Sequence, residues 1–339
     1  MSEVIRLGLD IAKNVFQVHG VNAAEEVVVQ RSLRRGRLLA FFATLPPCLI
    51  GIEACATAHY WARALTGLGH TVKLIPPAYA KPYVRRNKND AADAAAICEA
   101  ISRPSMRFVE AKTEEQQAAT GMHKVRDLLV KQRTMALNAL RGLMAEFGVV
   151  AAAGAHHVAH LVTIVTDPED GRIPAPLRRE LVRLAETLAH LEREIAGIDK
   201  DIAAWGRQNK TCRHLATAPG YGPILASAMA AKVPNPAVFD TGRHFAASLG
   251  LVPGQHGTGG KARLGPISKR GDGYLRRLLV NAAMSVMNSK WGKQDPWILT
   301  LLRTKPRKLV AVALANKLAR IGWALMTRQE DFRARPAAA

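Results

Sequence analysis

Four acidic residues in the first hundred positions have the types and spacing of a metal-binding site. Asp10 and Glu53 each follow a short apolar run, which places each carboxylate at the end of a predicted strand. Asp90 and Asp93 are three residues apart in an Ala-rich stretch that predicts a helix, so both carboxylates lie on one helix face. Three segments that are far apart in the sequence therefore offer carboxylates.

Carboxylate oxygens are the ligands that hard divalent cations prefer, and two such ions can clamp the attacking and leaving oxygens of a phosphoryl displacement. We therefore expect Mg²⁺, or Mn²⁺, and phosphoryl-transfer chemistry. Each residue alone could equally be a turn residue or a helix cap. The combination favours the metal site, and Glu53 most of all, because it has apolar neighbours and a buried carboxylate without a partner is costly.

The first 110 residues alternate strand and helix signals, which predicts an α/β unit. We expect strands at 4–9, 15–18, 27–29, 49–53 and 72–75, with helices at 33–45 and 57–68. Three neighbouring strands followed by alternating helix and strand match the element order of a ribonuclease-H-like domain. A basic segment containing Arg85, Arg86 and Lys88 leads directly into Asp90 and would suit a phosphate backbone.

Residues 111–206 form the predicted helical or coiled-coil connection. Apolar residues recur at helical spacing over 114–147 and over 177–205, which predicts two long helices in an antiparallel hairpin. Such a hairpin could be a spacer, a dimerisation arm or an ordinary packed helical pair. The linking segment holds His156, His157 and His160. A metal site is conceivable there, but a flexible Ala-rich connection is the favoured interpretation.

Residues 207–330 form the predicted C-terminal domain, followed by a tail at 331–339. A Pro-Gly-Tyr-Gly turn with Gly220 and Gly222 separates predicted helices at 210–218 and 224–231, which is typical of a helix-hairpin-helix. Exposed backbone N–H groups at such a turn can hold a DNA phosphate, although the turn also occurs in helical proteins without a ligand.

A segment rich in Gly, Lys and Arg follows that turn. It lacks the order of a nucleotide-binding P-loop, and its glycines would permit close approach to a phosphate chain. Further helices are predicted at 278–288 and 310–326. The candidate phosphate-binding cations of this segment are Lys261, Arg263, Lys269, Arg270, Arg276 and Arg277.

The charge of the chain indicates a polyanionic partner. The 339 residues carry a formal net charge of +21. Residues 207–339 hold 22 Lys/Arg against 5 Asp/Glu, a net charge of +17, so this part is the expected nucleic-acid footprint. The four cysteines have no zinc-site spacing and are expected to be buried thiols in a reducing cytoplasm. No secretion signal or membrane span is expected.

Five segments occur in order along the chain: GLDIAK, GIEACATAHYW, NKNDAADA, APGYGPILA and ISKRGDGYLRRLLV. Together they resemble the DEDD transposases of the IS-one-ten insertion-sequence family, especially its IS-eleven-eleven branch, which are relatives of the Piv DNA invertases. The resemblance covers essentially the whole chain. It implies a RuvC-like (ribonuclease-H-fold) N-terminal domain, a coiled-coil connection and a mainly helical C-terminal transposase domain. The metal carboxylates of the family correspond to Asp10, Glu53, Asp90 and Asp93.

The resemblance also implies partners and a reaction. Family members recombine double-stranded donor and target DNA as multimers, guided by a structured bridge RNA that their own element encodes. This chain is then expected to be a dimer or tetramer that binds DNA and RNA near the nucleoid of a prokaryotic cytoplasm. The family uses a serine nucleophile just before a Gly-Gly-Lys sequence. By that alignment the position is Gly257 and the first available hydroxyl is that of Thr258, unless the register is one residue off; Ser268 is another hydroxyl, ten residues later. Glycine cannot attack phosphorus.

Three functions are consistent with a glycine at the position of the family's serine nucleophile. The first is an RNA-guided transposase that uses Thr258, or an inactive copy of one. The second is a metal-dependent nuclease of the Holliday-junction type, which uses activated water and needs no serine. The third is a catalytically silent nucleic-acid-binding protein.

Overall fold

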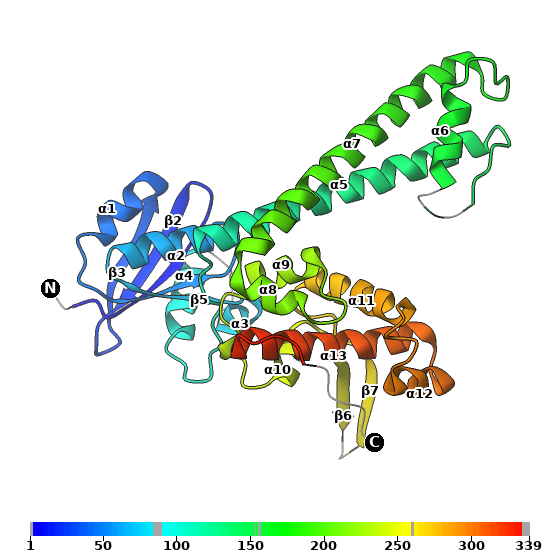
Figure 1. Ribbon diagram of the computed structural model, residues 1–339. Helices are drawn as coiled ribbons and strands as arrows, with labels where there is room; N and C mark the ends of the chain where they lie inside the picture. Colours follow the sequence, from blue (N-terminus) through cyan, green and yellow to red (C-terminus); the bar gives the residue numbers. More distant parts are fainter. Residues whose placement is uncertain (1–2, 84–89, 153, 155–156, 259–260, 334–339) are drawn as a thin grey trace. The chain divides into compact units, whose positions relative to one another are not determined.

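A computed structural model describes residues 3–83, 90–152, 154, 157–258 and 261–333 (Figure 1). The chain divides into two compact units, Met1–Glu114 and Glu115–Ala339. The first unit is an α/β structure and the second is mainly helical, as the sequence predicts.

The N-terminal unit is built on a five-stranded mixed sheet with the strand order β3-β2-β1-β4-β5. Strand β1 pairs antiparallel with β2 and parallel with β4, while β2–β3 is antiparallel and β4–β5 is parallel. The strands are β1 (Arg6–Asp10), β2 (Val15–Val21), β3 (Val27–Arg34), β4 (Leu49–Glu53) and β5 (Thr71–Ile75).

Helices cover both faces of this sheet. Because side chains alternate along a strand, Leu7 and Leu9 of β1 enter one core with residues of α1 (Leu38–Phe42) and α2 (Ala58–Gly67). Helix α4 (Asp90–Ala100) packs on the opposite face, against β1, β2 and β4. Two shorter helices, α3 (Pro77–Ala80) and a 3₁₀ turn at Lys81–Tyr83, precede it.

The helix predicted at 33–45 is wrong at its beginning. Leu33 and Arg34 belong to β3, because the antiparallel pairing with β2 continues through Phe16↔Leu33 and Val15↔Arg34. A 3₁₀ turn at Arg35–Arg37 follows, and α1 itself spans five residues. Strand pairing has overridden the local helix signal.

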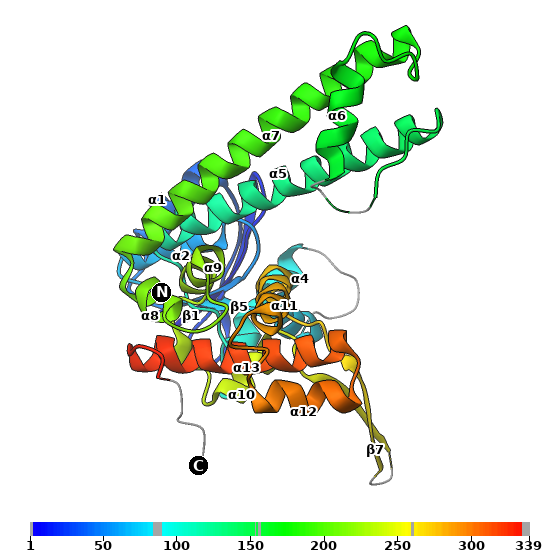
Figure 2. The same cartoon turned by 45° about the vertical axis from the view of Figure 1, so that its right-hand side comes forward.

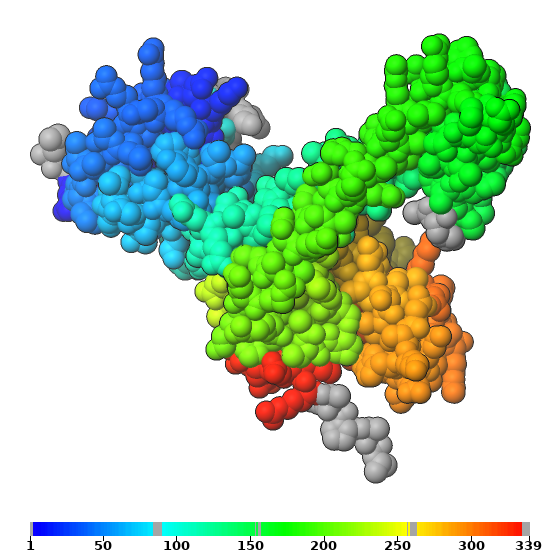
Figure 3. Space-filling model, turned by 45° about the horizontal axis from the view of Figure 1, so that its top comes forward, coloured from blue at the N-terminus to red at the C-terminus, as the bar shows by residue number. Residues whose placement is uncertain are grey.

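Two long helices, α5 (Glu114–Ala145) and α7 (Ala175–Gln208), run alongside each other in the second unit. The prediction of two long helices is confirmed. The link between them is not a simple flexible connection, since it contains α6 (Val158–Thr166), whose Leu161 and Val165 are fully buried against α5 and α7. Helix α6 and the adjoining ends of α5 and α7 form the broad green end visible in Figure 3. His156 lies outside the described residues, and His160 is exposed on α6.

The remaining helices pack around α13 (Arg307–Arg328). This helix is long and apolar enough to cross a membrane by length and composition, but half of its apolar stretch is buried in the protein core. The other helices are α8 (Lys210–Ala216), α9 (Pro223–Lys232), α10 (Gly242–Ser248), α11 (Gly273–Asn288) and α12 (Pro296–Thr304).

A β-hairpin, β6 (Pro253–Thr258) and β7 (Lys261–Ile267), occupies the Gly-rich basic segment. It extends away from the helices in both Figure 1 and Figure 2. The sequence did not predict this hairpin or helices α10 and α12.

Candidate metal centre

Asp10 and Glu53 are the last residues of two adjacent parallel strands. The register of the β1–β4 pair ends at Leu9↔Ile52, so each carboxylate-bearing residue follows directly after a paired position. The carboxyl ends of parallel strands meet at one edge of a sheet. The sequence prediction that each of these residues ends a strand is confirmed.

Two glycines set the distance between this edge and α4. Gly8 and Gly51 lie opposite each other in the β1–β4 register, each two residues before a carboxylate. A Cβ atom on Gly8 would lie 2.0 Å from the carbonyl oxygen of Ala94, and one on Gly51 would lie 2.5 Å from Cγ2 of Ile101. Helix α4 therefore rests directly on strand backbone. Because residues two apart share a face, Asp10 and Glu53 project on the side that α4 covers.

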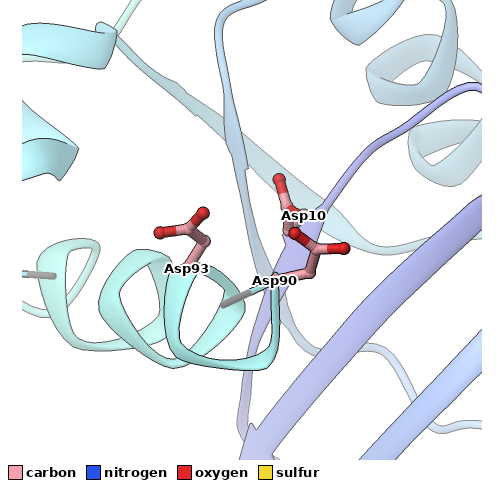
Figure 4. Close-up of side chains that lie close together, drawn as sticks. All are labelled: Asp10, Asp90 and Asp93. Atoms are coloured by element: carbon pink, nitrogen blue, oxygen red, sulfur yellow. The ribbon is translucent and has the colours of Figure 1, made fainter. Parts of the chain in front are cut away.

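Helix α4 brings two further carboxylates to this edge. Asp90 and Asp93 lie in its first turn, where negative charge is favourable for the helix dipole. Asp10, Asp90 and Asp93 each offer one oxygen atom, and these atoms all lie within 4.8 Å of one another (Figure 4). Asp10 and Asp93 are half-buried, whereas Asp90 is exposed.

Glu53 lies at the same edge but outside this group of three among the residues described. The charges of Glu53 and Asp10 both act on the thiol of Cys55. Partial burial, followed by the charges of Glu53 and Asp10, raises the pKa of the Cys55 thiol. Glu53 and Asp10 end neighbouring parallel strands, so both carboxylates belong to the same edge of the sheet. Cys55 is an exposed residue, so the prediction of four buried cysteines is wrong for this one and confirmed for Cys48, Cys98 and Cys212.

This donor set fits a hard divalent cation. Ligands that share one Mg²⁺ ion at about 2.1 Å lie at most about 4.2 Å apart, which is close to the spread of the three oxygens. Three carboxylates so close together also repel one another, and a cation relieves that repulsion. Asp10, Asp90 and Asp93 are therefore the residues that could hold a metal, with Glu53 beside them.

The cations predicted to bind nucleic acid fall into three groups: those outside the described residues, those that are exposed, and those with protein partners. Arg85, Arg86 and Lys88 lie outside the described residues. Arg263, Lys269 and Arg270 are exposed, and Lys261 begins β7.

Arg276 and Arg277 have protein partners. Arg276 Nη1 donates to the carbonyl oxygens of Leu249 (2.9 Å) and Arg270 (2.8 Å). Arg277 forms an ion pair with Asp127, and its guanidinium lies 5.2 Å from the ring centroid of Tyr274.

The glycines near these cations allow backbone segments to pack together. Gly271 has φ +70°, and a Cβ there would lie 1.8 Å from the carbonyl oxygen of Ser248. Gly220 has φ +83° and lies against Val286 of α11, whereas Gly222 is exposed at the beginning of α9. Close packing within the chain accounts for Gly271 and Gly220 without any phosphate.

Gly257 and Thr258 end strand β6, opposite Ala262 and Lys261 of β7. Gly257 has no side chain, so of the two residues only Thr258 carries a hydroxyl.

Two structural positions were missed by reasoning from the sequence, namely Gly8 and Gly51. The signal that could have found them is the repeated spacing, Gly-x-Asp at the first strand and Gly-x-Glu at the fourth. A glycine inside a strand often marks the close approach of another backbone, which here is that of α4.

The sequence matches known transposases over nearly its full length. Residues 7–148 match a family described as a transposase of the DEDD, IS110 type, and residues 212–297 match the transposase IS116/IS110/IS902 family. A probable family 20 transposase of Pseudomonas aeruginosa is 51% identical over 332 residues, covering 97% of this chain and 98% of that protein.

Two other relatives are transposases for named insertion sequence elements. The one for IS1328 of Yersinia enterocolitica is 41% identical and covers 98% of this chain and 99% of its own length. The one for IS1111A of Coxiella burnetii is 38% identical, with 98% and 92% covered. The chain therefore belongs to the IS116/IS110/IS902 family of transposases.

Proposed function

We propose that this transposase cuts and rejoins DNA at a divalent-metal centre held by Asp10, Glu53, Asp90 and Asp93. The observation that carries the proposal is the convergence of three of these carboxylates, from a strand end and a helix, to within 4.8 Å. Membership of a DEDD transposase family, which implies use of a divalent metal and binding of DNA, supports it. Mg²⁺ or Mn²⁺ suits the all-oxygen donor set.

The fold around the centre supports the same proposal. We infer a RuvC-like, ribonuclease-H-type fold for the N-terminal unit. The antiparallel run β3-β2-β1, followed by the parallel strands β4 and β5, favours this assignment. We further propose that residues 111–206 are a coiled-coil connection and residues 207–330 a C-terminal transposase domain with a helix-hairpin-helix-like segment.

The four carboxylates share one part in this proposal, which is to hold the ion. The strands fix Asp10 and Glu53 on the sheet edge, and α4 fixes Asp90 and Asp93 above it. When bound there, a divalent ion would activate the attacking oxygen and stabilise the leaving oxygen of the scissile phosphate. The four side chains supply the negative charge that holds the ion. The exposure of Asp90 leaves one side of the centre open to a DNA strand.

The remaining parts of the proposal concern the nucleophile and the guide. We propose that the Thr258 hydroxyl attacks the scissile phosphate: a threonine–DNA phosphodiester forms, the P–O bond to the leaving strand breaks, and that strand departs with a free hydroxyl that takes up the proton. We also propose that an element-encoded structured RNA guides a cytoplasmic dimer or tetramer to donor and target DNA. The basic residues 207–339, with net charge +17, support binding of nucleic-acid backbones.

A metal-dependent nuclease that uses water is the second candidate, because Gly257 lacks a hydroxyl. A covalent protein–DNA adduct assay separates the two. An adduct that Thr258→Ala abolishes and Gly257→Ser increases supports the transposase mechanism. Cleavage without any adduct in either form supports the nuclease, and binding without cleavage supports a silent nucleic-acid-binding protein. Sequencing of nucleic acid that co-purifies with the chain tests the RNA guide, and its absence would contradict RNA guidance.

A further inference from the structure

Two tryptophans of the C-terminal unit remain exposed and take no part in the proposed chemistry. Trp291 is 40% exposed in the turn after α11, and Trp297 is 38% exposed as the second residue of α12. Helix α12 packs on α13, and Figure 2 shows the two helices running alongside each other. Indole rings bring a large apolar area, and Trp is enriched where proteins bind a partner.

The backbone that carries both indoles is held firmly. A Cβ on Gly292 would lie 2.0 Å from the carbonyl oxygen of Val286, so this turn fits closely against α11. The Gly292 N–H donates to Ser289 Oγ (3.2 Å), and the Asp295 side chain caps α12 by accepting from Ile298 N (3.0 Å). Ile298, next to Trp297, is fully buried. The backbone on which each indole stands is thus pre-organised, which lowers the entropy cost of binding.

The charge around the tryptophans is strongly positive. Residues 290–308 contain six Lys/Arg and one acidic residue, Asp295, which is the cap of α12. Lys317 of α13 adds a further cation, with its ammonium 4.5 Å from the centroid of the Trp297 ring. The six cations, all on exposed residues, are Lys290, Lys293, Arg303, Lys305, Arg307 and Lys308.

We propose that this surface, the tryptophan platform (Trp291, Trp297 and the six cations), binds unpaired nucleotides by stacking bases on the indoles while the cations hold the phosphates. Aromatic rings among cations are the means by which proteins bind single strands without reading sequence. Trp and Arg are both common at protein interfaces, but four of the six cations are lysines, which are depleted there, so a nucleic-acid strand is the favoured partner. Single-stranded DNA and RNA share this chemistry.

The lysine that covers Trp297 does not prevent stacking. An exposed cation–π contact changes an equilibrium by roughly two- to fivefold, whereas a stacked base changes it by roughly five- to 150-fold. A base can therefore displace the Lys317 ammonium, which then lies close to the neighbouring phosphate. The proposal rests on the proposed function only in that both assign nucleic acid as the partner, and it needs no metal.

Binding of a single-stranded oligothymidine to the full-length protein, with EDTA present, tests the proposal. Trp297→Ala and Trp291→Ala should each weaken binding by roughly five- to 150-fold, and Trp297→Phe should retain part of the affinity. An abasic oligomer of the same length, which has phosphates but no bases, should bind all variants within about twofold of one another. Trp205→Phe, on α7, controls for the loss of a tryptophan. Oligouridine and an abasic RNA, measured in parallel, show whether DNA or RNA is preferred.

Several results would overturn the platform. Unchanged oligothymidine affinity in both alanine variants would do so, and so would equal losses for the abasic oligomer, which indicate a structural effect. A change in oligomeric state without a change in binding would assign the surface to a protein partner. If the chain bound no nucleic acid of any kind, the proposed function would fail as well. If the chain binds nucleic acid with the same affinity after both tryptophan substitutions, the platform proposal fails and the proposed function stands.

Discussion

At the residue scale, the clustering of Asp10, Asp90 and Asp93 has an electrostatic cost that a metal would remove. Two like charges about 4 Å apart repel by about 1 kcal/mol in water and by about 4 kcal/mol near a protein surface. The fold tolerates three carboxylates within 4.8 Å because α4 is held by glycine contacts and buried apolar residues. The cluster is therefore expected to lower the stability of the metal-free protein and to raise its affinity for a cation.

Asp93→Asn separates these two effects. We expect the variant to raise the melting temperature of the metal-free protein by a few degrees, because about 1 kcal/mol of repulsion is removed. Addition of Mg²⁺ should raise the melting temperature of the wild type but not that of the variant. Differential scanning calorimetry in EDTA and in Mg²⁺ measures both. Glu192→Gln, on the exposed face of α7, is the control that removes a charge elsewhere. A variant that melts lower in EDTA and still responds to Mg²⁺ would contradict the shared site.

At the element scale, the close approach of α4 to β1 depends on Gly8. In Gly8→Ala the new Cβ would lie 2.0 Å from a backbone oxygen that cannot move without α4. We expect a loss of unfolding free energy of about 1–3 kcal/mol, typical of overpacking, together with loss of cleavage, because Asp93 precedes the displaced Ala94. Urea denaturation and a cleavage assay measure the two effects. Gly36→Ala, where a Cβ meets nothing within 4 Å, should change neither.

A second element-scale feature joins α5, α9 and α11 through His123. Its Nδ1 and Nε2 lie 3.0 Å from the Tyr274 hydroxyl and the Ser227 hydroxyl, respectively. Burial, then the charges of Lys232 and Arg126, lower the pKa of His123 to about 4. The folded protein therefore holds this imidazole neutral at pH values where the unfolded chain protonates it.

This shift predicts the pH dependence of stability. A histidine with a depressed pKa contributes its stability fully above the unfolded value of about 6.5, and the contribution is lost as pH falls toward 4. The total loss is roughly 3 kcal/mol. Chemical denaturation at pH 7.5, 6 and 5 measures the part that is lost by pH 5, roughly 2 kcal/mol. His123→Gln should lower stability at neutral pH and flatten this slope. An equally steep slope in the variant would assign the pH dependence to other groups.

At the scale of the whole molecule, the uneven charge makes nucleic-acid binding salt-dependent. If residues 207–339, with net charge +17, neutralise about six phosphates, affinity for duplex DNA should fall by about 10³-fold between 50 and 200 mM salt. Fluorescence anisotropy at several salt concentrations measures the slope. A fall of less than about tenfold would mean that the positive charge of the C-terminal residues does not serve phosphate binding.

Much of the centre could be predicted because its signals are local. Apolar runs that end in Asp10 and Glu53 predicted the strand ends, and an Ala-rich stretch predicted the helix that carries Asp90 and Asp93. The closeness of three carboxylates could not be predicted this way, because it depends on how α4 meets the backbone of Gly8. Pairing and packing partners decided the rest. Leu33 belongs to β3 because it pairs with β2, and Leu161 is buried because α6 packs against α5 and α7. Gly257 lies in a hairpin that the sequence did not signal by alternating apolar residues, and the apolar Leu264 of that hairpin is exposed.

The central claim is that the four carboxylates hold the metal that the DNA reaction requires. Cleavage of DNA that carries the ends of the element, with the co-purified nucleic acid retained, tests it most directly when wild type and Asp10→Asn are compared in Mg²⁺ and in EDTA. We predict cleavage by the wild type in Mg²⁺ alone, and a loss of roughly 100-fold or more in Asp10→Asn with DNA binding unchanged. Cleavage by the wild type in EDTA, or full activity of Asp10→Asn in Mg²⁺, would contradict the account.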